Sequence, residues 1–459
     1  MSDLSQIVKA YDVRGTVPDQ FDETVARALG VAFVEMLRDS GDDAGQIVLA
    51  HDMRASGPGL AAAFAAGANA AGAAVVHTGL GSTDQLYYAS GALGLPGAMF
   101  TASHNPAQYN GIKLCRAGAR PVGQDSGLAT IRERAQQLLD TGTVPAAGDP
   151  RIEHRDLLAD YAAHLRSLVE LSGIRPLKVV VDAGNGMGGH TVPAVLGDAV
   201  LPALPLEIVP LYFELDGSFP NHEANPLEPA NLVDLQAAVR RHGADLGLAF
   251  DGDADRCFVI DENGDPVSPS AITGLVAARE LARHPGGVVI HNLITSAAVP
   301  EIIEENGGVP VRSRVGHSFI KAEMARTNAI FGGEHSAHYY FRDFWFADTG
   351  MLAAMHVLAA LGGQDQPLSL FAAEYERYAA SGEINSTVAD APAKVAAVRA
   401  AFPQARFDEL DGLTVQVGDG AWFNLRASNT EPLLRLNVEA PKPEEMAALR
   451  DRVLAIVRG

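Results

Sequence analysis

Short apolar runs separated by helical patterns recur along the first third of the chain, and this alternation constrains the fold more than any other feature. The runs at residues 47–50, 74–76 and 97–100 have the length of buried strands. After the N-cap residue Asp22, the first helical pattern repeats apolar side chains every four positions, at Val25, Leu29, Phe33 and Leu37. Strand, helix and strand in this order predict βαβ units and a mainly parallel sheet.

Linker composition marks a domain boundary near residue 150, because residues 141–150 are rich in Thr, Gly, Ala and Pro. A second α/β segment begins at the apolar run 179–181, and a third has strands predicted at 288–290 and 329–331. The segment after about residue 370 has alternating strands and then a helix, which is typical of an α+β domain. We therefore expect four domains, at residues 1–150, 151–258, 259–370 and 371–459.

Charge and cysteine content exclude several classes of partner. The chain of 459 residues carries a formal net charge of -21, which repels phosphate polymers and predicts no nucleic-acid or anionic-membrane partner. Two cysteines are too few for a disulfide framework, and no stretch reaches the ~18 apolar residues of a membrane span. We expect a cytoplasmic protein with no obligate protein partner and with a small-molecule ligand.

Residues 251–256 (DGDADR) place three carboxylates at alternate positions between two apolar runs. Such carboxylates repel one another unless a cation lies between them, so Asp251, Asp253 and Asp255 predict a site for a hard metal ion such as Mg²⁺. A calcium EF-hand has similar spacing, but Arg256 stands where that loop requires glycine, and both flanks are predicted strands. We call residues 251–256 the acid loop.

Residues 101–106 (TASHNP) directly follow the apolar run 97–100. A loop at the carboxyl end of a parallel strand faces the ligand crevice of an open α/β sheet. Ser103 is therefore a candidate nucleophile or phosphate carrier, with His104 and Lys113 as candidate proton carriers. Taken alone, the motif also fits an ordinary turn before proline. We call residues 101–109 the serine loop.

Two further polar loops offer hydrogen-bonding groups. In residues 332–338 (GGEHSAH), Glu334 and Ser336 fit vicinal sugar hydroxyls, although a glycine-rich surface turn is the simpler explanation of this loop alone. In residues 426–432 (RASNTEP), an arginine and short donors fit phosphate oxygens, through Arg426, Ser428, Asn429 and Thr430. The run 184–189 (GNGMGG) matches a dinucleotide motif, but Asp182 interrupts the approach from the predicted strand to the turn.

Together with the opening run 9–15 (KAYDVRG), these four loops in this order resemble the α-D-phosphohexomutase superfamily over nearly the whole chain. Within it, the chain is most similar to bacterial phosphomannomutases and phosphoglucomutases. The resemblance implies an α/β fold: three related α/β domains with mixed, mainly parallel sheets and a C-terminal α+β domain around a central cleft. The loop of residues 332–338 departs from the family's common form at His335 and Ala337.

The resemblance also implies a role for each loop. Ser103 would be the phosphoserine and, through its phosphate, would share Mg²⁺ with Asp251, Asp253 and Asp255. Other residues would flank the transferred phosphoryl group, namely Arg14, His104, Lys113 and Arg256. The remaining residues would bind substrate: Glu334 and Ser336 its sugar hydroxyls, His338 and His317 from further positions in the cleft, and Arg426, Ser428, Asn429 and Thr430 its phosphate.

The expected activity is that of a phosphohexomutase, an isomerase that interconverts hexose 6-phosphate and hexose 1-phosphate, with a hexose 1,6-bisphosphate as intermediate and activator. Mannose phosphates are the expected substrates, and glucose phosphates are a second possibility. The alternatives are a phosphoglucomutase, a phosphoglucosamine mutase, a Mg²⁺-dependent sugar phosphatase that transfers to water, or a sugar-phosphate binding protein without activity.

Overall fold

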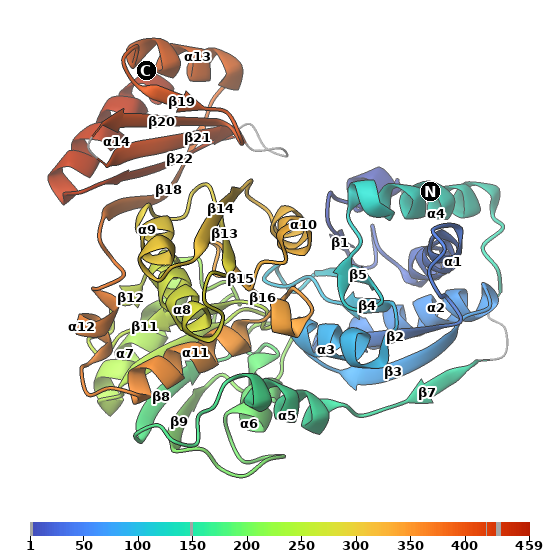
Figure 1. Cartoon of the computed structure of the whole chain (residues 1–459). Helices are drawn as coiled ribbons and strands as arrows, with labels where there is room; N and C mark the ends of the chain where they lie inside the picture. The colour runs from blue at the N-terminus through green and yellow to red at the C-terminus, as the bar shows by residue number, and fades with distance from the viewer. Residues whose placement is uncertain (1–2, 147–149, 419, 428–432) are drawn as a thin grey trace. The chain divides into compact units, whose positions relative to one another are not determined.

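The computed structural model describes residues 3–146, 150–418, 420–427 and 433–459 (Figure 1). Its contacts divide the chain into two compact units. The first unit comprises residues 1–267 and 336–369, and the second comprises residues 268–335 and 370–459. The boundaries of the four domains expected from the sequence stay a prediction.

The first unit begins with a seven-stranded sheet in the order β1-β5-β4-β2-β3-β7, with β6 paired to β5. Its central strands β4, β2 and β3 are parallel, and β5 runs antiparallel to β1 and β4. The strands are β1 (Val13–Thr16), β2 (Gln46–His51), β3 (Ala74–Leu80), β4 (Gly97–Phe100), β5 (Tyr109–Arg116), β6 (Arg120–Pro121) and β7 (Ile152–His154). The helices are α1 (Glu23–Asp39), α2 (Gly57–Ala70), α3 (Thr83–Leu93) and α4 (Leu128–Thr141).

Helices cover both faces of this sheet, which explains why its central strands β2 and β4 are largely apolar and buried (Figure 1). Alternate residues of β2 enter different cores: Ile47 and Leu49 pack with α1, α2 and α4, whereas Val48 and Ala50 pack with α3. With both faces buried, the polar loops at the carboxyl ends of the strands are the part of the sheet open to a ligand.

A second sheet in the same unit has the order β12-β11-β10-β8-β9. Strands β9, β8 and β10 are parallel, and β10 and β11 form an antiparallel hairpin around the acid loop. The strands are β8 (Leu177–Asp182), β9 (Leu206–Leu211), β10 (Leu246–Phe250), β11 (Cys257–Ile260) and β12 (Pro266–Val267). The remaining elements of the unit are α5 (Leu158–Leu168), α6 (Gly188–Val195), α7 (Val233–His242), β16 (Tyr339–Phe341), β17 (Ala347–Asp348) and α11 (Gly350–Gly362).

The second unit combines parallel strands with an antiparallel sheet. The parallel strands are β13 (Val288–Asn292), β14 (Val309–Ser313) and β15 (Phe331–Gly333), with helices α8 (Pro269–Arg283), α9 (Ala298–Glu305) and α10 (His317–Thr327). The antiparallel sheet has the order β18-β22-β21-β20-β19. Its elements are β18 (Ala379–Thr387), β19 (Arg406–Asp408), β20 (Leu413–Gly418), β21 (Ala421–Ala427), β22 (Leu433–Ala440), α13 (Ala391–Ala401) and α14 (Pro443–Arg458), and α12 (Leu368–Ala372) precedes them.

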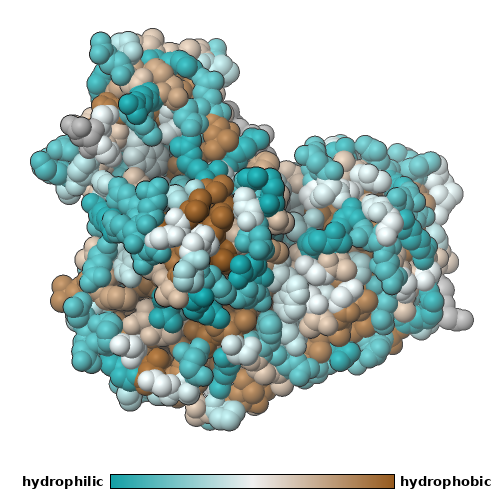
Figure 2. All heavy atoms as spheres, in the orientation of Figure 1, coloured by the Kyte–Doolittle hydropathy of each residue, from teal (hydrophilic) through white to brown (hydrophobic). Residues whose placement is uncertain are grey.

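Most elements expected from the sequence are present, and one strand is displaced. The strand predicted at 329–331 begins at Phe331 instead, because Asn328 ends α10 in the left-handed conformation with φ of 52° and the chain must turn before it enters the sheet. No helix in the described ranges is long and apolar enough to cross a membrane. Figure 2 shows hydrophilic side chains over most of the face that it presents.

Candidate active site

Ser103 lies at the carboxyl end of β4 with its side chain directed at the acid loop. Its Oγ donates a hydrogen bond to Asp251 Oδ2 at 2.8 Å and lies 3.2 Å from His104 Nδ1. Its backbone N–H donates to Thr101 Oγ1 at 2.9 Å, and its φ is 50°, a left-handed conformation that non-glycine residues rarely adopt. The serine hydroxyl is thus held in a fixed, strained position beside a carboxylate.

The acid loop gathers three carboxylates at the turn of the β10–β11 hairpin. Asp251, Asp253 and Asp255 are almost fully buried, and one oxygen from each lies within 4.8 Å of the others. Within the described ranges, Asp253 Oδ1 and Asp255 Oδ1 accept no hydrogen bond. Buried carboxylate oxygens in this number suit a hard divalent cation, so the residues fit a metal site, and the strands on both sides exclude an EF-hand.

Three cationic side chains lie at the acid loop and the serine loop. Lys113 Nζ lies 2.6 Å from Asp253 Oδ2 and 2.5 Å from Asp255 Oδ2. Arg256 Nη2 lies 2.9 Å from Asp251 Oδ2 and donates to His104 Nδ1 at 2.6 Å. Arg14 pairs with Asp12 at 2.7 Å and donates to Asn105 Oδ1 at 2.5 Å. Lys113 and Arg256 therefore pair with carboxylates of the acid loop, whereas Arg14 binds the serine loop.

Burial and the neighbouring charges shift three pKa values. Burial raises the pKa of Asp251 to about 7, against the lowering effect of Arg256. Burial together with the charges of Arg256 and Arg14 lowers the pKa of His104 to about 2, so its imidazole is neutral. Burial alone would lower the pKa of Lys113, but the carboxylates of Asp253 and Asp255 outweigh it and raise that pKa, so the ammonium stays charged.

Two supports of the acid loop were not predicted from the sequence. Thr83, the first residue of α3, donates from Oγ1 to Asp253 Oδ2 at 2.6 Å and from its backbone N–H to Asp253 O at 3.1 Å. The glycine run 184–189 packs against the same loop: Met187 N donates to Gly252 O at 2.8 Å, and a Cβ on Gly186 would lie 2.7 Å from that oxygen. Close packing, not a dinucleotide, accounts for these glycines.

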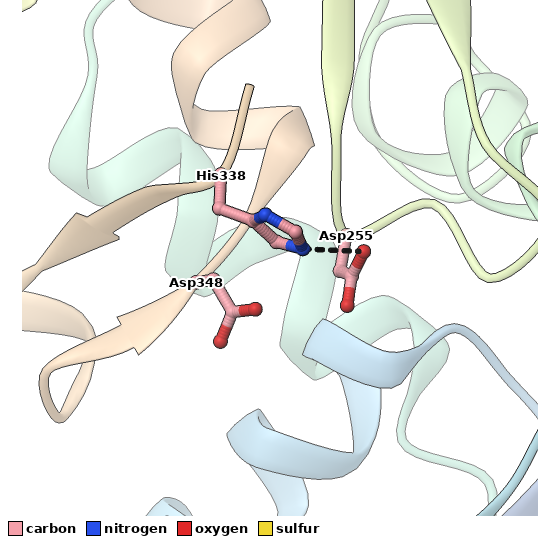
Figure 3. Close-up of side chains that lie close together, drawn as sticks. All are labelled: Asp255, His338 and Asp348. Carbon is pink, nitrogen blue, oxygen red and sulfur yellow. Dashed lines mark ion pairs between the residues drawn. The ribbon is translucent and has the colours of Figure 1, made fainter. Parts of the chain in front are cut away.

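Ser336 and His338 also belong to the first unit and lie beside the acid loop. The Oγ of Ser336 is 2.9 Å from His338 Nδ1. His338 Nε2 is 3.8 Å from Asp255 Oδ1 (Figure 3). A backbone bridge joins Arg256 to His338. Asp348 at the end of β17 completes a second group with Asp255 and His338 whose ligand atoms lie within 4.8 Å of one another. The structure thus brings two predicted sugar-binding residues to the acid loop.

The other predicted substrate residues belong to the second unit. Glu334 follows β15 and is buried, and its Oε1 accepts hydrogen bonds from Asn292 Nδ2 at 3.3 Å and Gly316 N at 3.1 Å. Arg426 is the last residue but one of β21, and its guanidinium lies 3.5 Å from Glu383 and 3.7 Å from Asp411, so carboxylates hold it in place. Ser428, Asn429 and Thr430 lie outside the described residues, as does the side chain of His317, which begins α10.

Four domain models of one family match the chain in order. They are described as the phosphoglucomutase/phosphomannomutase alpha/beta/alpha domains I, II and III and the C-terminal domain, and they match residues 5–140, 159–264, 269–378 and 383–456. These matches confirm the α/β fold class expected from the sequence, with four domains that have mixed, open sheets.

Relatives match over almost their entire length. The chain is 44% identical over 438 residues to "Phosphohexose mutases" of Xanthomonas campestris pv. campestris, and this match covers 94% of each chain. It is 41% identical over 443 residues to a phosphomannomutase of Salmonella montevideo, again covering 94% of each. A solved phosphoglucomutase/phosphomannomutase family protein from Burkholderia thailandensis has a TM-score of 0.86 and 32% identity, covering 100% of this chain and 98% of that one. The chain therefore belongs to the phosphoglucomutase/phosphomannomutase family, and its activity is that of a phosphohexomutase, an isomerase.

Proposed function

We propose that the enzyme interconverts hexose 6-phosphate and hexose 1-phosphate through phosphorylated Ser103 and a hexose 1,6-bisphosphate, and that mannose phosphates are its preferred substrates. The observation that carries the proposal is the hydrogen bond from Ser103 Oγ to Asp251 Oδ2 inside a buried cluster of carboxylates and cations. The names of several relatives as phosphomannomutases support mannose over glucose. Glucose phosphates remain the second candidate substrates.

Asp251, Asp253 and Asp255 would hold Mg²⁺ together with an oxygen of the Ser103 phosphate. When bound, this ion supplies positive charge against the oxygens of the transferred phosphoryl group. The donor set supports Mg²⁺, because it consists of carboxylate oxygens only and leaves room for phosphate and water ligands.

The residues around Ser103 have different electrostatic roles in the phosphoryl transfer. The P–O bond to Ser103 Oγ breaks as a new bond forms between phosphorus and the oxygen of the free sugar hydroxyl. The proton that this hydroxyl loses balances the proton that Ser103 Oγ gains. Lys113, Arg256 and Arg14 stay charged and offset the negative charge that spreads over the phosphoryl oxygens. Neutral His104 accepts a hydrogen bond from Arg256 at Nδ1 and adds no charge next to the serine.

Recognition of the sugar phosphate uses the remaining loops. We assign the sugar hydroxyls to Glu334 and Ser336, further contacts with the substrate to His338 and His317, and the second phosphate to the loop of Arg426, Ser428, Asn429 and Thr430. Because the bisphosphate must present each phosphate in turn to Ser103, the Arg426 loop must accept either end of the sugar, and a trace of bisphosphate acts as activator. A sugar phosphate is the only partner that we propose. The two buried, free cysteines support the cytoplasm as the compartment.

The proposal is tested with wild type and Ser103→Ala on mannose, glucose and glucosamine 1-phosphates plus a trace of glucose 1,6-bisphosphate. We expect isomerised sugar phosphate from the wild type, fastest with mannose, and phosphate on Ser103 detectable by mass spectrometry. Ser103→Ala should lose turnover while it still binds sugar phosphate. Release of inorganic phosphate without isomerisation would identify a phosphatase, intact ligand after long incubation would identify a binding protein, and full activity of Ser103→Ala would remove the serine from the mechanism.

A further inference from the structure

Asp52 and Arg54 form a fully buried ion pair directly after β2. Arg54 Nε lies 3.3 Å from Asp52 Oδ2, and the two side chains are 1% and 0% exposed. Arg54 N also donates a hydrogen bond to Asp52 Oδ1 at 3.0 Å. Asp52 N donates to Phe100 O at 2.9 Å, which ties this segment to β4. Burying a charged pair costs solvation free energy. A buried arginine therefore needs hydrogen-bond acceptors around its guanidinium.

Those acceptors are four carbonyl oxygens of the serine loop. Nη1 of Arg54 donates to Pro106 O at 2.9 Å and to Tyr109 O at 2.8 Å. Nη2 donates to Ser103 O at 2.8 Å and to Asn105 O at 2.6 Å. The planar guanidinium carries enough donors in a fixed fork to bind four carbonyls together, which a lysine ammonium with three donors cannot do.

The carbonyl of Ser103 is held from two directions. Arg54 Nη2 lies on one of them, and the backbone of Gly252 in the acid loop lies on another, so close that a Cβ there would be 2.4 Å from Ser103 O. Fixing this oxygen restricts rotation about the Cα–C bond of Ser103, and together with the φ of 50° this fixes the backbone from which Oγ projects. Without its donors the serine would relax toward an ordinary backbone conformation.

The segment that follows β9 of the second sheet also covers Arg54. Its guanidinium carbon lies 5.2 Å from the ring centroid of Phe219, and a Cβ on Gly217 would lie 2.8 Å from Arg54 Cα. Arg54 as a whole is only 2% exposed. A side chain enclosed in this way binds the loop and does not reach a substrate.

We propose that Arg54 is a positioning residue for phosphoryl transfer: it fixes the strained backbone of Ser103 through four carbonyls and so aims Oγ at the acid loop. This inference rests on the proposed role of Ser103. It assigns to Asp52 the task of orienting the guanidinium. The consequence is that changes at Arg54 affect the turnover of bound substrate more than its binding.

The test compares Arg54→Lys and Arg54→Ala with Arg166→Lys. Arg166 is a matched control, because its guanidinium also donates to three backbone carbonyls, at Val195, Pro202 and Gly197, and none of these belongs to the site. We expect Arg54→Lys to lower kcat by about 100-fold, the cost of a small misplacement of a reacting group, with KM changed less than about threefold. Phosphorylation of Ser103 by glucose 1,6-bisphosphate should slow in parallel, and Arg166→Lys should keep its kcat.

Chemical rescue keeps the test decisive if the lysine variant folds poorly. Millimolar guanidinium chloride should raise the kcat of Arg54→Ala several-fold and leave the kcat of wild type and Arg166→Lys unchanged. Unaltered kcat in Arg54→Lys, an equal loss in Arg166→Lys, a loss confined to KM, or no rescue would each overturn the inference. Full activity of Ser103→Ala would instead overturn the proposed function, so the two failures are distinguishable.

Discussion

The serine loop and the acid loop face each other, yet they are held in opposite ways. Each contains a non-glycine residue with positive φ, Ser103 at 50° and Ala254 at 61°. The serine loop is bound through its backbone, by the guanidinium of Arg54. The acid loop is bound mainly through its side chains, by Lys113 and Thr83 from outside and by its own Arg256. A loop held by its backbone leaves the serine side chain free for chemistry, whereas carboxylates in close contact need cations and donors.

The largest effect should come from removing one charge of the acid loop. Asp253→Asn keeps the shape but loses the anion that faces Lys113 and Thr83, each at 2.6 Å from Oδ2. We expect activity to fall by about 10³-fold or more, measured as initial rate at saturating Mg²⁺. Asp261→Asn is the control, because that carboxylate lies at the turn after β11 and accepts bonds from Asn263 N and Asp265 N. Equal losses in both variants would contradict a role for charge.

The next largest effect should be a pH dependence of the free energy of unfolding that is caused by Asp84. This residue follows Thr83, which binds the acid loop. Burial raises the pKa of Asp84 from 3.8 to about 6, despite hydrogen bonds from Ser82, Thr349 and Tyr161. Between about pH 4 and pH 6 the folded protein keeps a proton that the unfolded chain releases, so the free energy of unfolding should fall by about 3 kcal/mol as the pH rises.

Asp84→Asn has no such proton and should not show this fall. Urea unfolding of both proteins at pH 4, 5, 6 and 7 measures the difference, and parallel pH curves for the two would refute the shift. Activity measured in the same series tells whether the support passes through Thr83 to the acid loop.

A smaller loss is expected where the two loops touch. In Gly252→Ala the new Cβ would lie 2.4 Å from Ser103 O, and neither backbone can yield easily. We expect a loss of about 2 kcal/mol in the free energy of unfolding, together with reduced phosphorylation of Ser103. Gly173→Ala serves as control, because nothing lies within 4 Å of a Cβ there. A fully active and stable Gly252→Ala would mean that the loops are not in fixed contact.

The smallest effect should follow from relieving backbone strain at Ala254. Glycine adopts a φ of 61° without steric cost, but it also gains freedom in the unfolded chain. These contributions oppose each other, so Ala254→Gly should change the free energy of unfolding by less than about 1 kcal/mol. Ala448→Gly, on the exposed side of α14, should cost about 1 kcal/mol. A clearly larger loss in Ala254→Gly would show that its methyl group matters.

The local sequence pattern was sufficient to predict the strands, helices and loops that carry the site residues. The strand expected at 97–100 is β4, and Asp22 caps α1 by accepting a hydrogen bond from Val25 N at 2.8 Å. The acid loop was predicted as a cluster because three carboxylates follow one strand at alternate positions. Thr83 was not predicted, since nothing near it in sequence signals Asp253, from which it is separated by 170 residues. The glycine run 184–189 resembled a ligand motif because close packing and ligand approach select the same residue.

The sequence by itself determined the family, the order of strands and helices, and the chemical type of each loop, because hydrophobic periodicity and turn chemistry act between near neighbours. The tertiary structure decided that Arg54 takes the carbonyls of the serine loop and that Lys113 pairs with two carboxylates of the acid loop. Such contacts depend on how distant segments pack, and desolvation makes each buried charge depend on partners that local sequence does not specify.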